Sequence, residues 1–216
     1  AGLVGIGLSA LFSASGRESE RLQQETELAN SMGLLLQKTN ISRDYYEDLN
    51  LGRVFWPRQI WGKYAERLEE FHDKPSSPES LACINEMVTN ALQHVSNCIM
   101  YLHLIKDPQV FRFCAIPQVM AMATLAKIYN NPQVYTEVVK IRKGIAAKLM
   151  LGTNDMEALK KYMEGFVEDI RKQLNESDPN YALTKKRLNR IIEALDDVKY
   201  NQADITEHFV EETVLF

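Results

Sequence analysis

The stretch NDMEALKKYMEGFVEDI, residues 154–170, repeats its large apolar side chains at intervals of three and four residues. These side chains are Met156, Leu159, Met163, Phe166, Val167 and Ile170. Because an α-helix turns once in 3.6 residues, that spacing gathers them on one face. Asn154 and Glu157 form a capping-box pattern at the start of the stretch. The stretch therefore predicts an amphipathic helix.

The rest of the chain also favours helices. Pro57, Pro78 and Pro108 each open a helical stretch, where proline lacks only a donor that would have no intrahelical partner. No alternation of period two is long enough for a sheet, so we expect an all-α fold. The expected helices lie near residues 1–13, 20–50, 57–71, 78–106, 108–130, 132–142, 154–175 and 183–200. We expect one helical domain over residues 1–200 and a loosely ordered tail over residues 201–216.

Composition narrows the class of protein. The chain has 216 residues, and 45% of them are hydrophobic, which is enough to form a hydrophobic core. Its net charge of −4 makes nucleic acid an unexpected partner. Cys83, Cys98 and Cys114 form no C-x-x-C pair and are expected to be buried, reduced thiols. The histidines lack the spacing of a zinc site. No apolar run reaches the ~18 residues that cross a bilayer, so no spanning segment is expected.

The segment QKTNISRDYYEDLNLGRVFWP, residues 37–57, carries an acidic pattern late in a predicted helix. Residues four apart share a helix face, so Asn40, Asp44 and Asp48 form a stripe beside Gln37 and Glu47. The helical rise separates Asp44 from Asp48 by about 6 Å, which suits carboxylates that hold Mg²⁺ on a diphosphate. The alternative is a solvated acidic face. The apolar and aromatic flanks favour a pocket wall.

Two further segments suggest binding surfaces. VFRFCAIPQVMAMATLAKIY, residues 110–129, is nearly all apolar with Pro117 at its middle, where proline kinks a helix and frees a carbonyl. It is either a core helix or the wall of an apolar cavity. VVKIRKGIAAK, residues 138–148, clusters Lys140, Arg142, Lys143 and Lys148, which could neutralise phosphates or form a solvated basic face.

The glycines near the start of the chain have a separate explanation. Gly2, Gly5 and Gly7 have the wrong spacing for a dinucleotide fingerprint and follow no strand. We expect them to permit the close approach of a helix or a substrate chain.

Four segments together resemble a known family. AGLVGIGLSALFSAS, ANSMGLLLQKTNISRDYYED, VFRFCAIPQVMA and VVKIRKG, in this order, closely resemble eukaryotic squalene synthases over residues 1 to about 175. The resemblance implies an isoprenoid-synthase-like helical bundle. It also implies that the family's first aspartate-rich motif and catalytic tyrosine precede the first segment. We therefore expect this chain to be the C-terminal half of the catalytic domain, a partial bundle without the N-terminal helices.

The resemblance assigns roles to individual residues. The family's second aspartate-rich motif would be Asp44, Glu47 and Asp48, with Asp44 and Asp48 as the ligands of Mg²⁺. The residues at positions that contact the phosphates of NADPH would be Arg43, Lys140 and Arg142. The substrate pocket would be lined by Val4, Leu8, Gln37, Asn40, Tyr101, Phe113, Cys114 and Pro117.

The implied activity is that of squalene synthase. Two molecules of farnesyl diphosphate condense over Mg²⁺ to presqualene diphosphate, which NADPH reduces to squalene in sterol biosynthesis. One alternative is a catalytically incomplete domain that binds only prenyl diphosphate or partners. Another is a phytoene-synthase-like enzyme that needs no NADPH, which Lys140 and Arg142 disfavour. The resemblance also implies a monomer at the cytosolic face of the endoplasmic reticulum membrane.

Overall fold

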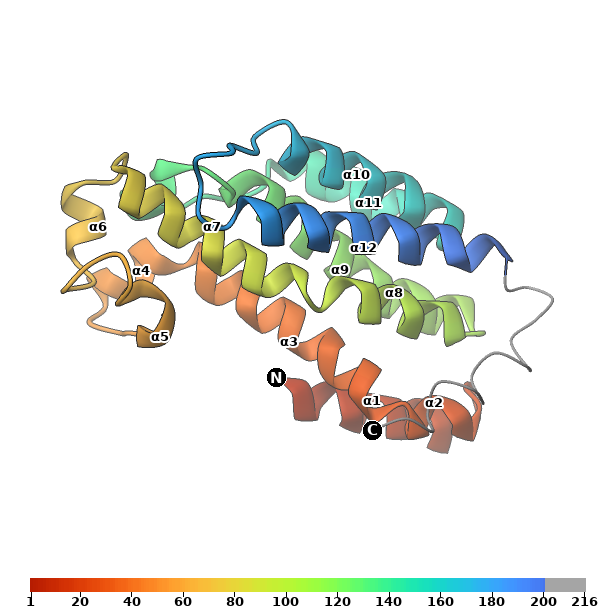
Figure 1. Cartoon of the computed structure of the whole chain (residues 1–216). Helices are drawn as coiled ribbons and strands as arrows, with labels where there is room; N and C mark the ends of the chain where they lie inside the picture. Colours follow the sequence, from red (N-terminus) through yellow and green to blue (C-terminus); the bar gives the residue numbers. More distant parts are fainter. Residues whose placement is uncertain (201–216) are drawn as a thin grey trace, which may run out of the picture.

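The protein is built from helices that lie largely side by side (Figure 1). A computed structural model describes the backbone of residues 1–200 and the side chains of residues 1–197. The expected loose tail, residues 201–216, lies outside the described residues. Between residues 1 and 200 every regular element is helical, which confirms the all-α prediction. The α-helices are α1 (Gly2–Ala14), α2 (Glu20–Gln24), α3 (Thr26–Arg43), α4 (Tyr45–Asn50), α5 (Arg58–Trp61), α6 (Glu70–Asp73), α7 (Pro78–Leu92), α8 (Val95–Leu104), α9 (Pro108–Ile128), α10 (Lys143–Gly152), α11 (Met156–Arg171) and α12 (Tyr181–Tyr200), and η1 (Pro132–Tyr135) is a 3₁₀ turn.

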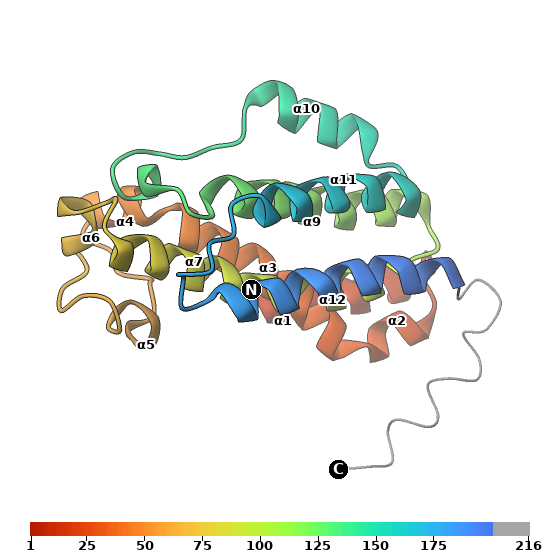
Figure 2. The same cartoon turned by 45° about the horizontal axis from the view of Figure 1, so that its top comes forward.

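The long helices surround one hydrophobic core. α3 packs against α1, α7, α8 and α9, while α12 packs along α7, α8 and α11. α10 lies on the outside of these packed helices, next to α9 and α11 (Figure 2). The short helices α4, α5 and α6 gather at one end of the molecule. Cys83, Cys98 and Cys114 are buried free thiols, as predicted.

Most residues of helix α9 are buried in the hydrophobic core. Contrary to the sequence expectation, it is long and apolar enough to cross a membrane by length and composition alone. However, 67% of its apolar window is buried inside the protein. The helix also runs without interruption through Pro117. Its apolar character therefore serves packing within the bundle.

Several predicted helices end earlier than expected. The predicted helix 20–50 is divided at Glu25 and Asp44, and the predicted helix 78–106 is divided at Gln93 and His94. The predicted helix 57–71 reduces to α5 and α6, because the intervening chain makes tertiary contacts instead. There the Leu68 carbonyl accepts a hydrogen bond from Tyr45 Oη at 2.7 Å. The break within 57–71 thus coincides with a long-range contact that helical periodicity does not encode.

The region around residues 132–157 differs most from the prediction. In place of a helix over 132–142, η1 occupies only residues 132–135, since Tyr135 is fully buried and its hydroxyl donates to the Ser80 carbonyl at 2.7 Å. α10 was not predicted. At the start of α11 the capping residue is Asp155, whose Oδ1 accepts from the Ala158 N–H at 2.8 Å. The predicted apolar face of α11 is confirmed, with Leu159 among its fully buried residues.

Glycines bring α1 into close contact with α3. A Cβ added at Gly5 would lie 2.1 Å from the Ala29 carbonyl oxygen, and one at Gly33 would lie 2.3 Å from the Ala1 oxygen. A Cβ at Gly7 would meet nothing within 4 Å. The expected close approach of a helix is thus confirmed for Gly5 and also for Gly2, where an added Cβ would lie 1.7 Å from Asn30 Oδ1, and Gly7 faces open space.

We expect Gly5→Ala to destabilise the protein by about 1–3 kcal/mol, because the added methyl group must push the α1 and α3 backbones apart. The matched change Gly7→Ala, on the same helix, should be neutral or stabilise by up to about 1 kcal/mol, since alanine favours a helix. Urea unfolding of both variants measures the difference. Equal stabilities would show that α1 and α3 do not depend on this contact.

Candidate active site

The acidic residues lie where α3 passes into α4. Asp44 is the junction residue, with φ −89° and ψ 14°, so the predicted single helix is two helices with a bend between them. The hydrogen-bond ladder nevertheless continues through the junction. The Asp44 N–H donates to Asn40 O at 2.9 Å, and the Asp48 N–H donates to Asp44 O at 2.9 Å. Asp44 and Asp48 therefore remain one turn apart, as the sequence predicted.

Each carboxylate of the acidic trio, Asp44, Glu47 and Asp48, has a basic partner. Arg43 holds Asp44 with two hydrogen bonds, Nε to Oδ1 at 2.6 Å and Nη2 to Oδ2 at 2.9 Å. Arg53 Nε lies 3.8 Å from Asp48 Oδ1. Lys140 Nζ lies 3.9 Å from Glu47 Oε1, which brings a residue distant in sequence to the trio.

Burial and charge act together on these groups. The side chains of Asp48, Asp44 and Glu47 are 16%, 25% and 43% exposed. Burial raises the pKa of Asp48; Arg53 opposes this, and the neighbouring Asp44 and Glu47 add to it. The hydrogen bond to Asp44 raises the pKa of Arg43. The three carboxylates are thus partly buried and close together, and an added cation would stabilise their negative charge.

The donor set fits Mg²⁺ in one particular way. Among the side chains of residues 1–197, no three from His, Cys, Asp and Glu converge closely enough to hold one metal ion by themselves. Mg²⁺ is commonly bound through one or two carboxylates, with waters and substrate phosphates as its other ligands. Asp44 and Asp48, a turn apart and partly exposed, suit that role and do not form a closed cage.

A buried aromatic cluster packs against α4, the helix that carries Glu47 and Asp48. It consists of Tyr45, Trp56, Phe71 and Tyr135. The Tyr45 ring lies 5.1 Å from that of Trp56 and 4.9 Å from that of Tyr135, both edge-on. Trp56 Nε1 donates to the Ile41 carbonyl at 2.8 Å, which ties the chain after α4 back to α3. Since Tyr45 follows Asp44 directly, the cluster determines where α4 points its carboxylates.

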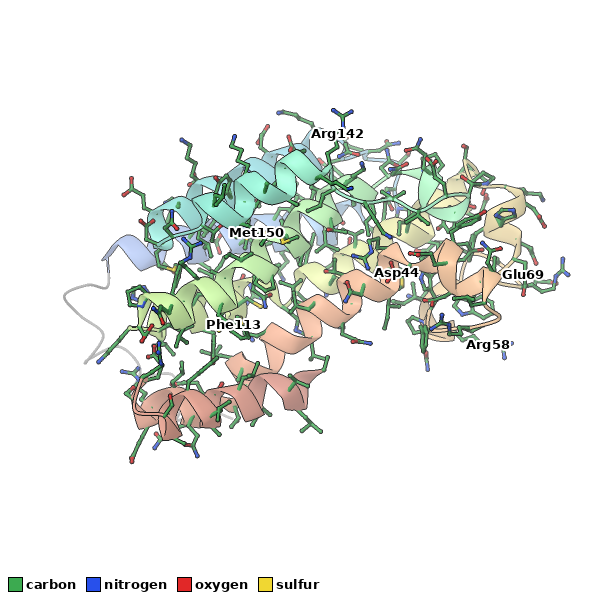
Figure 3. All side chains as sticks on the ribbon, turned by 180° about the vertical axis from the view of Figure 1, so that it is seen from behind. Asp44, Arg58, Glu69, Phe113, Arg142 and Met150 are labelled. Carbon is green, nitrogen blue, oxygen red and sulfur yellow. The ribbon has the colours of Figure 1, made fainter. Side chains whose placement is uncertain are left out.

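The basic segment, residues 138–148, places its two predicted phosphate-binding residues, Lys140 and Arg142, differently relative to the acidic trio. Val139 is buried, while the neighbouring Lys140 side chain is 62% exposed. Arg142 precedes α10 and is exposed, and within the described part of the chain it forms no ion pair. The structure therefore brings Lys140 to the acidic trio, and leaves Arg142 at the start of α10 (Figure 3).

The predicted apolar wall is split between surface and core. Val4 and Phe113 are 63% and 59% exposed, whereas Tyr101 and Cys114 are only 2% and 8% exposed. Burial raises the pKa of the Cys114 thiol to about 12. Phe12 packs edge-on against Phe113 at 6.0 Å, which links α1 to α9. Val4 and Phe113 thus offer apolar surface, and Tyr101 and Cys114 pack the core behind it.

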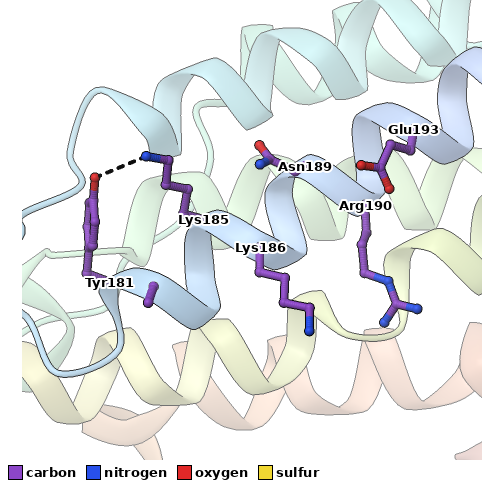
Figure 4. Close-up of a pocket in the computed structure, with 7 residues that line it drawn as sticks. Tyr181, Lys185, Lys186, Asn189, Arg190 and Glu193 are labelled. Carbon is purple, nitrogen blue, oxygen red and sulfur yellow. Dashed lines mark hydrogen bonds between the residues drawn. The ribbon is translucent and has the colours of Figure 1, made fainter.

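The remaining predicted pocket residues are placed as follows. Leu8 and Pro117 are half-buried, and Gln37 and Asn40 are exposed on α3. Two hollows flank α12, and neither includes any predicted site residue. One of them is a shallow depression on α12 itself, lined by Lys185 and six further residues of that helix (Figure 4). The expected enclosed cavity beside the acidic trio is not among these hollows.

Sequence reasoning missed two residues of the site. Arg53, the partner of Asp48, follows Gly52, whose positive φ of 65° turns the chain back toward α4. A Leu-Gly-Arg sequence directly after a helix was the available signal. Tyr135 had no comparable signal, because its neighbours in the aromatic cluster are distant in sequence.

Comparison with known proteins gives a consistent result. Residues 1–145 match the squalene/phytoene synthase family. The squalene synthase of Rattus norvegicus is 51% identical over 88% of this chain and 46% of that protein. Squalene synthase 1 of Arabidopsis thaliana is 49% identical over 88% of this chain and 47% of that protein. The chain spans about half the length of the curated relatives it matches.

Solved structures agree. The complex of TcSQS with the ligand E5700 superposes with a TM-score of 0.89 at 41% identity, covering 92% of this chain and 58% of that one. A second complex, of TcSQS with BPH1237, gives a TM-score of 0.88, also at 41% identity, covering 91% of this chain and 58% of that one. The helical arrangement is therefore shared along with the sequence.

Proposed function

Since this chain belongs to the squalene/phytoene synthase family, we propose that it contributes the second diphosphate-binding motif and the NADPH-phosphate contacts of a squalene synthase. The proposed reaction joins two farnesyl diphosphates to presqualene diphosphate and reduces that product to squalene. The observation that carries the proposal is the meeting of the acidic trio with Arg43 and Lys140. This arrangement offers carboxylates for Mg²⁺ and basic groups for phosphates at one place.

The residues of this chain divide the work. Asp44 and Asp48 would hold Mg²⁺, which supplies positive charge to the departing diphosphate. Arg43, Lys140 and Arg142 would bind the phosphates of NADPH, Arg as a fork and Lys as a point charge. The residues that would shield the hydrocarbon chains from water are Val4, Leu8, Phe113 and Pro117. Water must be excluded there, because it would capture a carbocation as an alcohol.

The ion pairs imply an exchange of partners on ligand binding. A metal ion on Asp44 would compete with the Arg43 guanidinium, which donates to both carboxylate oxygens. A displaced Arg43 would then offer its guanidinium to a phosphate.

We expect Arg43→Gln to bind Mn²⁺ about two- to fivefold more tightly than the unmodified protein when no substrate is present, because the metal no longer competes with an ion pair. Electron paramagnetic resonance of free Mn²⁺ measures this affinity. The matched change Arg142→Gln removes a guanidinium that has no carboxylate partner within the described residues, and should leave the affinity unchanged. Weaker metal binding by Arg43→Gln would refute the exchange.

A product assay tests the function itself. The protein is incubated with farnesyl diphosphate, Mg²⁺ and NADPH. Squalene with matching NADPH consumption supports the proposal. A condensed product without NADPH consumption favours the phytoene-synthase-like alternative. Binding of prenyl diphosphate without turnover favours the catalytically incomplete domain.

The proposal extends to the cellular setting. Squalene is a hydrocarbon that partitions into membranes, so we propose that the protein works at the cytosolic face of the endoplasmic reticulum membrane. We propose, from the family resemblance, that it works there as a monomer. Fractionation of cells that express it tests the placement, and a protein found only in the soluble fraction would contradict it.

A further inference from the structure

The ion pair between Lys140 and Glu47 is too weak to explain by itself why the two residues meet. Lys140 Nζ lies 3.9 Å from Glu47 Oε1, and the two side chains are 62% and 43% exposed. Exposed ion pairs contribute little to stability and are screened by salt. Other contacts must therefore hold the Lys140 segment, residues 136–142, beside α4.

The backbone of the Lys140 segment has few hydrogen bonds of its own. The N–H groups of Thr136 and Glu137 donate to the Gln133 carbonyl at 3.1 and 3.0 Å. Residues 138–142 lie in no helix, and within the described part of the chain their N–H groups make no hydrogen bond to another backbone group. The position of the segment thus depends on the groups that anchor its ends.

Tyr135 anchors the start of the segment. Its side chain is fully buried, and its hydroxyl donates to the Ser80 carbonyl at 2.7 Å. Its own carbonyl accepts a hydrogen bond from His72 Nδ1 at 2.8 Å. Because a carbonyl can only accept, Nδ1 of His72 carries the proton in this contact. His72 therefore holds the backbone of Tyr135, while Ser80 holds its side chain.

The same histidine ring also contacts α4. The ring of Tyr46 lies 6.1 Å from that of His72, and the angle between the two planes is 22°, so the rings are stacked. Tyr46 directly precedes Glu47 and packs half-buried against the core. His72 belongs to α6, which lies at the same end of the molecule as α4 (Figure 2). One ring thus joins the helix that carries Glu47 to the residue from which the Lys140 segment starts.

We infer that His72 is a positioning residue, which holds the Lys140 segment beside the acidic trio through its contacts with Tyr135 and Tyr46. The function proposed above assigns no role to His72. The inference rests on that proposed function for the ligand of Lys140, the phosphates of NADPH, and on the structure alone for the contacts of the ring. A loosened segment would keep Lys140 away from its phosphate for part of the time, and would weaken binding of NADPH.

Substitutions of His72 test this role. His72→Ala removes both the hydrogen bond and the ring, whereas His72→Asn keeps an amide that can donate to the Tyr135 carbonyl. We expect His72→Ala to bind NADPH about three- to tenfold more weakly than the unmodified protein, and His72→Asn to bind with an affinity between the two. Calorimetric titration measures these affinities. The control His103→Ala removes a half-buried histidine of α8, and should bind within about twofold of the unmodified protein, because one lost contact far from the site does not couple to it.

A double-mutant cycle distinguishes positioning from general damage to the site. If His72 acts through Lys140, His72→Ala should change the affinity by less than about twofold in a protein that already carries Lys140→Gln. Equal weakening with and without Lys140→Gln would overturn the inference, because His72 would then support the site as a whole. Folding does not confound this comparison. The His72 side chain is exposed, so we expect His72→Ala to lower the melting temperature by no more than about 5 °C.

Hydrogen exchange tests the inference without NADPH. The amides of Thr136 and Glu137 are hydrogen bonded at the anchored end of the segment. We expect His72→Ala to speed their exchange about three- to tenfold and to leave exchange in the buried helix α9 unchanged. Unchanged exchange at both amides would overturn the inference. Faster exchange in a protein that does not bind NADPH would support the positioning role and would reject the proposed cofactor instead.

Discussion

Under the proposed function, Asp48→Asn is expected to lower squalene formation about 10²–10³-fold and to weaken Mn²⁺ binding by at least about tenfold. The change keeps the shape of the most buried side chain of the acidic trio, which is 16% exposed, and removes its charge. Metal ions supply several kcal/mol of stabilisation to developing negative charge, and that stabilisation depends on charged ligands. Product analysis and paramagnetic resonance of Mn²⁺ measure the two effects.

The two readouts separate a metal role from a structural one. Asp48 provides no side-chain cap to α4, and its ion pair with Arg53 is long, at 3.8 Å, so the fold should tolerate the change. Asp169→Asn is the matched control, because Asp169 forms a comparable pair with Lys172 at 3.7 Å on α11, away from the site. Unchanged turnover by Asp48→Asn would reject its assigned role, whatever happened to stability. Asp44→Asn should behave similarly but would also release Arg43.

Tyr135→Ala should cost about 3–5 kcal/mol of unfolding free energy. The side chain is fully buried, and its ring lies 4.9 Å from that of Tyr45 and 5.4 Å from that of Phe71. Removal of a large aromatic side chain from a core leaves a cavity, and costs of this size are typical. Because the cavity opens beneath α4, the same variant should bind Mn²⁺ more weakly. Denaturant unfolding and the metal titration measure both effects.

Tyr135→Phe is the matched control for this prediction. It keeps the ring and removes the hydroxyl group, which donates a hydrogen bond to the Ser80 carbonyl at 2.7 Å. We expect a loss of about 1–3 kcal/mol, because the buried carbonyl would lose a partner. If the alanine and phenylalanine variants were equally stable, the packing of the aromatic cluster would not be what holds η1 and α4 together.

Much of the fold could be predicted because it depends on local patterns. The helical starts at Pro78 and Pro108 follow from proline after a capping residue, and Ser77 and Asp107 do accept the first-turn N–H groups. The apolar face of α11 follows from a spacing of three and four. Two of the predicted helices that failed, 57–71 and 132–142, lie where buried tyrosine side chains make tertiary hydrogen bonds to backbone carbonyls.

The site divides in the same way. The sequence by itself determined that Asp44 and Asp48 lie one helical turn apart, because residues four apart in a hydrogen-bonded helix always do. Only the tertiary structure decided that Lys140 reaches Glu47 and that Tyr135 packs against Tyr45 of α4. Those meetings depend on how whole helices pack, and packing is set by long-range contacts that no local period records.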